Sequence, residues 1–382
     1  MPSTIRARRL YLDQEQSLWM LRTISLRNWR KNLPNRLSIQ EYKQGVLNGE
    51  RSVLARAITL VESQRSVDRK LAQTLIQSIV PHTGHSFRIG VSGLPGVGKS
   101  TLLDALGMLL IDKGHSVAIL AVDPSSNMGG GSILGDKTRM HRLSHEPNAY
   151  IRPSASGSSL GGVAQKTRES ILLCEAAGFD IIIVETVGVG QSEVEVSNMV
   201  DCFLALMLPG GGDELQGIKK GVLERADIIV INKADEERLM LARGTLREHR
   251  AALHYLRPRH PTWKPVAMMT SAITGMGLEE LWRTIQEHKQ TLISCGALKE
   301  LRSEQQRLWM WRLIEDGLRD RFFEHPIIQN LLPRYEQEVQ QGIRLPTQAS
   351  SLLLASFFQE EHDHVYPQRI TNIKSNSSHE DR

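Results

Sequence analysis

The residues best suited to chemistry form a phosphate-binding loop, with the order Gly93-Leu94-Pro95-Gly96-Val97-Gly98-Lys99-Ser100. An apolar run at 87–92 precedes the loop and predicts a buried strand, and residues 101–110 predict a helix. The glycine amides would then lie at a helix N-terminus, where backbone N–H groups bind phosphate. Lys99 would reach the terminal phosphates, and the Ser100 hydroxyl would bind Mg²⁺.

A second motif indicates the base. The apolar run Ile228–Ile231 ends in the NKxD sequence Asn232-Lys233-Ala234-Asp235. The carboxylate of Asp235 can accept two hydrogen bonds from guanine, whereas adenine lacks the exocyclic amine there and would leave the carboxylate unpaired. An isolated NKxD also fits a solvated turn, but its place at a strand end after a phosphate loop favours GTP and GDP as ligands.

Other residues would complete the base contact. Asn232 would bond the other edge of guanine, and the stem of Lys233 would pack along the ring plane. Thr270-Ser271-Ala272 follows a strand-like run at 266–269 and would add a third contact.

Acidic residues between these motifs are candidates for metal binding and switching. A predicted strand at 117–122 ends at Asp123, which would lie at the C-terminal edge of the sheet, where such folds bind ligands. The loop 127–135 carries four glycines and precedes Asp136. This loop fits a mobile nucleotide-binding segment, and a flexible connector is the alternative.

Glu185 follows a further predicted strand at 179–184, where many G proteins carry an aspartate. Ras-like enzymes place the glutamine that positions water directly after the glycine of this motif. Here Gln191 lies three residues after Gly188 instead of directly after it, so we expect slow intrinsic hydrolysis.

These motifs together resemble one family. The segments GLPGVGKST, AVDPSS, GGSILGDKTRM, ETVGVGQSE, GGGDELQGIKKG and INKAD are similar to the MeaB/ArgK-type GTPases of the SIMIBI class. The resemblance runs from about Ser38 to about Glu360. It implies a G-protein chaperone that forms a homodimer and couples GTP hydrolysis to cobalamin loading and protection of an adenosylcobalamin-dependent acyl-CoA mutase of the methylmalonyl-CoA mutase type.

The resemblance also assigns roles to residues. It implies phosphate binding by Gly93 to Thr101 and guanine binding by the NKxD residues with Ser271 and Ala272. Mg²⁺ would be held by Ser100, with Asp123, Asp136 and Glu185 nearby. The catalytic set would be Lys99, Glu185 and Gln191, and residues 210–221 would form a further switch that signals to the mutase through Asp213, Glu214 and Lys219. Without the family, that segment also fits a simple loop.

Composition excludes several other classes. The net charge of +5 is concentrated in residues 1–36, where eight basic and two acidic residues give +6 and leave −1 for the remainder, so no nucleic-acid partner is expected. The 3 cysteines are widely separated and favour a reducing compartment. The apolar runs are strand-sized and too short to span a membrane. We expect a cytoplasmic protein, or one of the mitochondrial matrix if the basic N-terminus is a transit peptide.

The predicted fold is an α/β P-loop NTPase with a mostly parallel sheet, helices on both faces and helical additions at each end. Ser38 and Glu41 have capping-box spacing, and two amphipathic helices follow over 53–61 and 71–79. The expected organisation is a basic extension (1–37), a helical segment (38–86), the GTPase domain (87–295), a C-terminal helical region (296–360) and a polar tail (361–382). Leu308, Trp311 and Leu318 recur at helical spacing, which fits a dimer contact or an intramolecular core.

Two other functions remain open from the sequence. A metallochaperone GTPase would normally carry clustered metal ligands, whereas the 13 histidines are scattered. A kinase of a transport binding protein would need a catalytic-loop signature that the sequence lacks. A nucleotide-dependent clamp without significant turnover is a third alternative.

Overall fold

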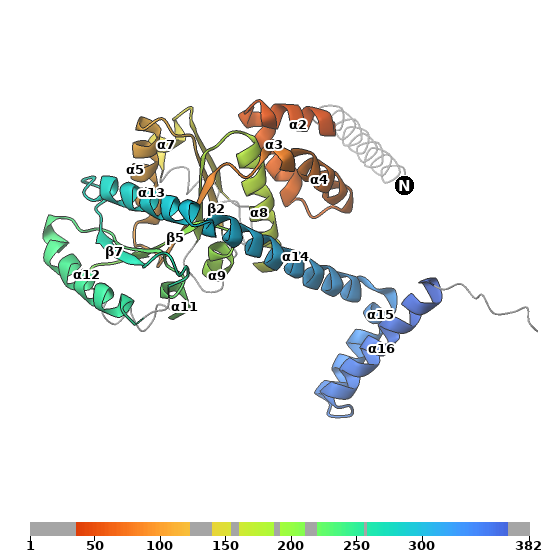
Figure 1. Cartoon of the computed structure of the whole chain (residues 1–382). Coiled ribbons are helices and arrows are strands. Elements are labelled where there is room, and N and C mark those ends of the chain that lie inside the picture. Colours follow the sequence, from red (N-terminus) through yellow and green to blue (C-terminus); the bar gives the residue numbers. More distant parts are fainter. Residues whose placement is uncertain are drawn as a thin grey trace, which may run out of the picture. The chain divides into compact units, whose positions relative to one another are not determined.

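The computed structural model describes residues 36–122, 140–153, 160–186, 192–210, 220–255 and 258–365, and the side chains at 160–163, 192, 220, 221 and 359–365 are not described. The chain divides into two compact units (Figure 1). One contains residues 1–84 with Leu172–Gly178, and the other contains His85–Ile171 with Phe179–Arg382.

The first unit is built from short helices: α2 (Ile39–Leu47), α3 (Arg51–Glu62), α4 (Ser66–Ile79) and the 3₁₀ turn η1 (Val80–His82). The predicted capping box is confirmed, since the Ser38 hydroxyl accepts from the Glu41 amide and the Glu41 carboxylate accepts from the Ser38 amide. Leu54, Ile58 and Leu75 are fully buried between the helices. The two predicted helices are therefore preceded by a third, and the three share one core.

The second unit contains a seven-stranded sheet in the order β3-β2-β4-β1-β5-β6-β7, with every neighbouring pair parallel. Its strands are β1 (Phe87–Gly93), β2 (Val117–Val122), β3 (Ala149–Pro153), β4 (Ile181–Thr186), β5 (Cys202–Met207), β6 (Ile228–Ile231) and β7 (Val266–Met269). Parallel strands are joined by crossovers that place helices on the faces of the sheet. The predicted class of fold is confirmed.

Helices cover both faces of this sheet (Figure 1). One face packs against α5 (Lys99–Asp112), α7 (His141–Ser144) and α13 (Leu278–Ser294). The other face packs against α9 (Ser192–Ser197), α11 (Lys220–Leu223) and α12 (Leu239–Leu253). The unit also contains part of α8 (Leu160–Ala176) and the 3₁₀ turn η2 (Glu236–Arg238). Because all strands run the same way, their C-terminal ends meet at one edge, which holds the predicted motifs.

The expected strands at β2, β6 and β7 have the observed bounds, β1 is longer by one residue, and β4 starts and ends two residues later than 179–184. Glu185 therefore belongs to the strand instead of following it. Sequence reasoning did not identify β3 and β5.

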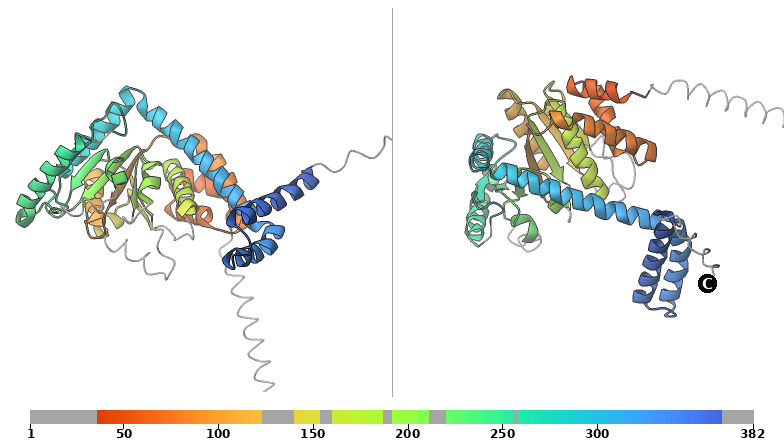
Figure 2. Two further views of the ribbon diagram at one scale, coloured as in Figure 1. Left: turned by 90° about the horizontal axis from the view of Figure 1, so that it is seen from below. Right: turned by 45° about the vertical axis from the view of Figure 1, so that its right-hand side comes forward.

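Three helices follow the sheet: α14 (Ala297–Glu324), α15 (Pro326–Gln340) and α16 (Pro346–Val365). Figure 2 shows α15 and α16 side by side at the end of α14, where Ile328, Leu353 and Phe357 form a small buried cluster. Apolar side chains that are exposed in the single chain lie along α14, namely Leu308, Met310, Trp311, Leu313, Ile314, Leu318 and Phe323. Trp309 instead lies half-buried beneath the guanidinium of Arg168.

The start of α14 is attached to the sheet through a buried acid. Arg302 donates to both carboxylate oxygens of Asp201 over 2.9 and 2.7 Å and to the Ser86 carbonyl over 2.6 Å. Asp201 is fully buried before β5 and also accepts from the Arg88 amide over 2.8 Å. One arginine therefore links α14 to the N-terminal ends of β1 and β5.

Cationic and amide side chains also hold the chain segment that directly follows α9. The carbonyl of Asn198 accepts from Arg168 over 2.9 Å, and the carbonyl of Val200 accepts from Gln305 over 2.8 Å and from Arg259 over 3.1 Å. Cations near a helix C-terminus satisfy its free carbonyls and complement its dipole. The end of α9 is thus fixed to α8 and α14.

We predict that Arg302→Ala lowers the free energy of unfolding by about 3–5 kcal/mol, because it leaves the Asp201 carboxylate buried without its cation. Urea unfolding followed by circular dichroism measures the change. Arg307→Ala is the matched control on the same helix, since Arg307 pairs with an equally exposed Glu304 and such pairs contribute about 0–1 kcal/mol. Equal losses in the two variants would contradict the role given to Arg302.

In the described ranges, none of the helices combines the length and the hydrophobicity that a membrane-spanning segment requires.

Candidate guanine-nucleotide site

The phosphate-binding loop connects β1 to α5 at the C-terminal edge of the sheet. Gly96 and Gly98 adopt φ values of 82° and 91°, in the left-handed region that favours glycine. Gly98 directly precedes α5, so the first free amides of the helix face the loop. The strand, the glycine turn and the helix N-terminus predicted from the sequence are all present, and together they form a site for phosphate groups.

Lys99 is buried with its ammonium inside the loop. Its Nζ donates to the carbonyls of Gly93 and Leu94 over 2.7 and 3.3 Å. Burial lowers the pKa of Lys99, and the carboxylates of Glu185 and Glu193 act in the opposite direction. The ammonium of Lys99 is therefore held by the loop backbone, and two nearby carboxylates favour its charged form.

The residues at the start of α5 suit a magnesium ion. The Ser100 hydroxyl lies 3.3 Å from a carboxylate oxygen of Glu185, which is itself buried at the end of β4. Mg²⁺ prefers hydroxyl, carboxylate and water oxygens in proteins. Ser100 and Glu185 thus supply oxygen donors of the kind Mg²⁺ binds, and their assignment as ligands stays a prediction.

The predicted base-binding residues are brought against the phosphate loop by Asn232. Its side-chain amide donates to the Val97 carbonyl over 2.9 Å, and its side-chain oxygen accepts from the Thr270 hydroxyl over 3.2 Å. Asn232 is almost fully buried. It joins β6, β7 and the loop, which gives it a positioning function in addition to the predicted contact with the base.

Gly98 lies under this amide, so we predict that Gly98→Ala disrupts the site. A Cβ atom there would lie 2.8 Å from Asn232 Nδ2, and the φ of 91° is strained for alanine. We expect at least a roughly tenfold weaker affinity for GDP from the lost contact and strain, measured by titration with a fluorescent nucleotide. Gly114→Ala at the other end of α5 is the control, because its φ of 87° is similar but no atom lies within 4 Å of the added carbon. Equal effects would show that backbone strain alone is responsible.

Asp235 faces a hollow beside the loop. The Ser271 hydroxyl donates to its carboxylate, and the Thr274 amide donates to the Ser271 oxygen over 3.2 Å. The hollow has a volume of about 260 Å³ and is lined in part by Gly98, Asn232, Lys233, Asp235 and Ala272. Lys233 has a φ of 59°, a conformation that is uncommon for residues other than glycine. The structure therefore brings the two predicted base-binding motifs together around one cavity.

Several predicted site residues lie outside the described residues. They are Asp123, Asp136, Gln191, Asp213, Glu214 and Lys219.

Sequence reasoning missed Glu193, which the structure places within electrostatic reach of Lys99 and which is 5% exposed. Charged and apolar residues alternate after Gln191, as they do in many solvent-exposed segments. Only the helical spacing of Glu193 and Val196 could have indicated that the glutamate faces inward. Thr186 was also missed, and its hydroxyl donates to Ser92 over 2.9 Å, which joins the ends of β4 and β1.

The fold and the site define a P-loop protein that binds guanine nucleotides. The chain also matches the family model described as "Methylmalonyl Co-A mutase-associated GTPase MeaB" over residues 54–327, and it belongs to this family. The resemblance inferred from the motifs and the predicted GTPase activity are both confirmed.

Similar proteins occur in bacteria and animals. The chain is 52% identical over 321 residues to a protein of Caulobacter vibrioides named as a GTPase, which covers 84% of this chain and 98% of the relative. It is 46% identical over 323 residues to the mouse "Methylmalonic aciduria type A homolog, mitochondrial", covering 82% of this chain and 78% of the relative. The solved structure "Crystal structure of LAO/AO transport system kinase" shares 38% identity with a TM-score of 0.68, over 86% of this chain and all of that chain (100%).

Proposed function

We propose that this GTPase is a chaperone of an adenosylcobalamin-dependent acyl-CoA mutase, and that its GTPase cycle controls cobalamin loading and protection of that enzyme. The observation that carries the proposal is a guanine-nucleotide site in a chain whose family model is described by association with methylmalonyl-CoA mutase. The mouse relative, named for methylmalonic aciduria, supports the same partner.

The described residues can bind and orient GTP. The amides at the start of α5 and the Lys99 ammonium would hold the phosphates, Asp235 would select guanine, and Asn232 would fix the distance between these two parts. Mg²⁺ would neutralise phosphate charge when held by Ser100 and Glu185. Positioned donors of this kind stabilise charge that develops on the transferred phosphoryl group.

Communication with the mutase is assigned to the segment of Asp213, Glu214 and Lys219 and to the loops that carry Asp123, Asp136 and Gln191. The support is the resemblance of their sequence segments to the family. We infer that mutase docking completes the positioning of water, since Gln191 is displaced from the position that Ras-like enzymes use.

We also infer a homodimer formed through the C-terminal helices. The support is the set of large apolar side chains that α14 leaves exposed in the single chain, since exposed apolar surface of this kind marks interaction sites. Light scattering on the purified protein should give twice the chain mass of 42.9 kDa, and Leu318→Glu with Trp311→Glu should convert it to the monomer. A monomeric wild-type protein would contradict this inference. The inferred compartment is the cytoplasm, with the mitochondrial matrix as the alternative; the name of the mouse relative describes that protein as mitochondrial.

Single-turnover hydrolysis of GTP with and without the mutase tests the proposed function. We expect the rate constant to rise roughly tenfold or more when methylmalonyl-CoA mutase is added, because docking would supply missing transition-state contacts. Cobalamin transfer to the apo-mutase should in turn require GTP. An unchanged rate and nucleotide-independent transfer would contradict the chaperone function while leaving the GTPase activity intact.

The alternative is a protein kinase, which the name of the similar solved structure favours. A kinase would transfer the terminal phosphoryl group to a protein, whereas a GTPase transfers it to water. Incubation of the protein with γ-labelled GTP and a transport binding protein separates the two functions, since only a kinase would transfer the label to the binding protein. Labelling would support the alternative.

A further inference from the structure

Helix α9 carries one acidic side chain, Glu193, that is buried inside the protein. Glu193, Val196 and Ser197 are buried and follow the i, i+3, i+4 spacing of a single face of α9, and Val200, three residues after the end of the helix, is buried as well. Val196 and Val200 lie against Gly90 of β1, where an added Cβ would be within 3.1 and 2.8 Å of them. This packing holds Glu193, one turn earlier, toward the C-terminal edge of the sheet, where the phosphate loop lies.

In the described part of the chain, one of the two carboxylate oxygens of Glu193 receives no hydrogen bond. Glu193 is 5% exposed, and its buried Oε2 atom has no hydrogen-bond partner among the described residues. Burying a carboxylate oxygen without a partner is costly. Such a group indicates a missing donor at the site.

The surroundings indicate which donor is missing. Glu193 acts electrostatically on Lys99, the loop residue that also lies near Glu185. Phosphate oxygens are acceptors and anionic, so they cannot satisfy a carboxylate. The O–H groups of water bound at the phosphates can.

We propose that Glu193 is a second acidic residue of the nucleotide site, and that its carboxylate accepts a hydrogen bond from a water molecule at the terminal phosphate of bound GTP. Two waters have this chemistry, one bound to Mg²⁺ and one that attacks the phosphorus. In the second case Glu193 supplies part of the water positioning that Gln191 does not, and mutase docking would complete it. The inference rests on the GTPase activity of the family and not on the mutase partnership.

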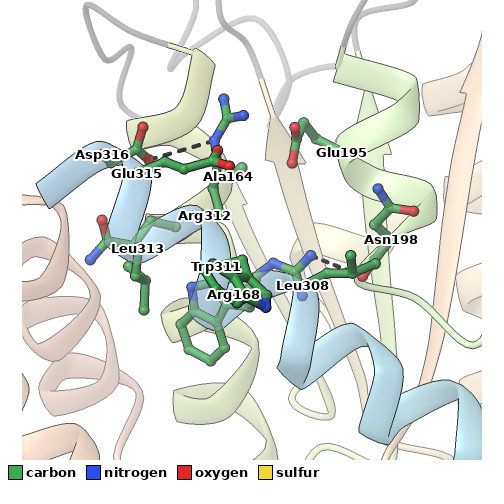
Figure 3. Close-up of a pocket in the computed structure, with 12 residues that line it drawn as sticks. Ala164, Arg168, Glu195, Asn198, Leu308, Trp311, Arg312, Leu313, Glu315 and Asp316 are labelled. Carbon is green, nitrogen blue, oxygen red and sulfur yellow. Dashed lines mark hydrogen bonds and ion pairs between the residues drawn. The ribbon is translucent and has the colours of Figure 1, made fainter. Parts of the chain in front are cut away.

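The same helix supplies a matched control. Glu195 lies two residues further and faces away, into a hollow of about 210 Å³ between α8, α9 and α14 (Figure 3). It is half-buried near Arg168 and Arg312 and belongs to neither nucleotide motif. Glu193→Gln and Glu195→Gln therefore each remove one negative charge from α9, the first from its buried side and the second from the side that faces the hollow.

The first measurement is the melting temperature without nucleotide. Glu193→Gln should melt at or above the wild-type temperature, because a buried, incompletely paired charge is removed. A carboxylate with only a structural role would give a lower melting temperature, and a variant that melts well below wild type or fails to fold would overturn the proposal.

The second measurement separates the two waters. If Glu193 positions the attacking water, Glu193→Gln should lower kcat roughly 10²-fold while the affinity for a non-hydrolysable GTP analogue stays within about twofold. If it binds a water of Mg²⁺, the Mg²⁺ concentration for half-maximal analogue binding should rise roughly tenfold. Either result supports the proposal. If Glu193→Gln and Glu195→Gln have the same kcat and the same Mg²⁺ dependence, the proposal is overturned. That result would leave the GTPase activity of the wild-type protein and its proposed coupling to the mutase standing.

Discussion

Lys99→Ala is expected to abolish measurable GTP hydrolysis and to weaken GTP binding by roughly 30-fold or more, because a charge-assisted contact contributes about 2–3 kcal/mol. The rate effect should be larger, roughly 10²–10³-fold, since the ammonium stabilises charge that grows on the phosphoryl oxygens. The loss also removes the cation on which the carboxylates of Glu185 and Glu193 act. Single-turnover hydrolysis and nucleotide titration measure the two effects.

Lys113→Ala is the control for this variant. Lys113 follows the other end of α5 and pairs over 2.9 Å with Glu279, whose side chain is 69% exposed. Removing it changes the net charge equally but leaves the loop untouched, so turnover should stay within about twofold. Turnover by Lys99→Ala close to the wild-type rate would refute the assignment of the phosphate site.

Asp235→Asn is expected to relax the preference for guanine. The carboxylate would accept from two guanine N–H groups, whereas an asparagine amide presents its own donor to one of them. The affinity for GTP should fall by roughly 10- to 150-fold, for a loss of about 1–3 kcal/mol. Xanthosine triphosphate, which carries a carbonyl at that position, should gain affinity. Competition of GTP, ATP and xanthosine triphosphate against a fluorescent nucleotide gives the ratios.

Glu236→Gln removes the same charge from the adjacent, exposed position. It should leave the base preference unchanged. If Asp235→Asn still discriminates against ATP as strongly as the wild type does, Asp235 does not contact the base.

Most of the sheet could be predicted because five of its strands, β1, β2, β4, β6 and β7, are short apolar runs that end in residues with recognisable chemistry. Strand β5, Cys202–Met207, is a continuous apolar run, and periodicity alone does not separate such a run from a buried helix. Strand β3 ends in Pro153 and contains Arg152, a composition typical of an edge strand, where it is found.

In the site, the local motifs were predictable and the long-range contacts were not. The loop and NKxD sequences are readable because each motif is contiguous. The bond from Asn232 to Val97 spans 135 residues and depends on the order in which the strands assemble. The same holds for Glu193, whose inward direction follows from the packing of Val196 and Val200 on β1.

The attachment at the end of α9 has a consequence for variation in this protein. Arg168, Arg259 and Gln305 donate to the main-chain carbonyls of Asn198 and Val200, directly after α9. Helix α9 itself carries Glu193, whose charge acts on Lys99. Substitutions on the inner side of α14 can therefore alter turnover without touching any residue that contacts nucleotide. Natural sequence changes on that helix offer a route to tune the lifetime of the GTP-bound protein while its affinity and base preference stay constant.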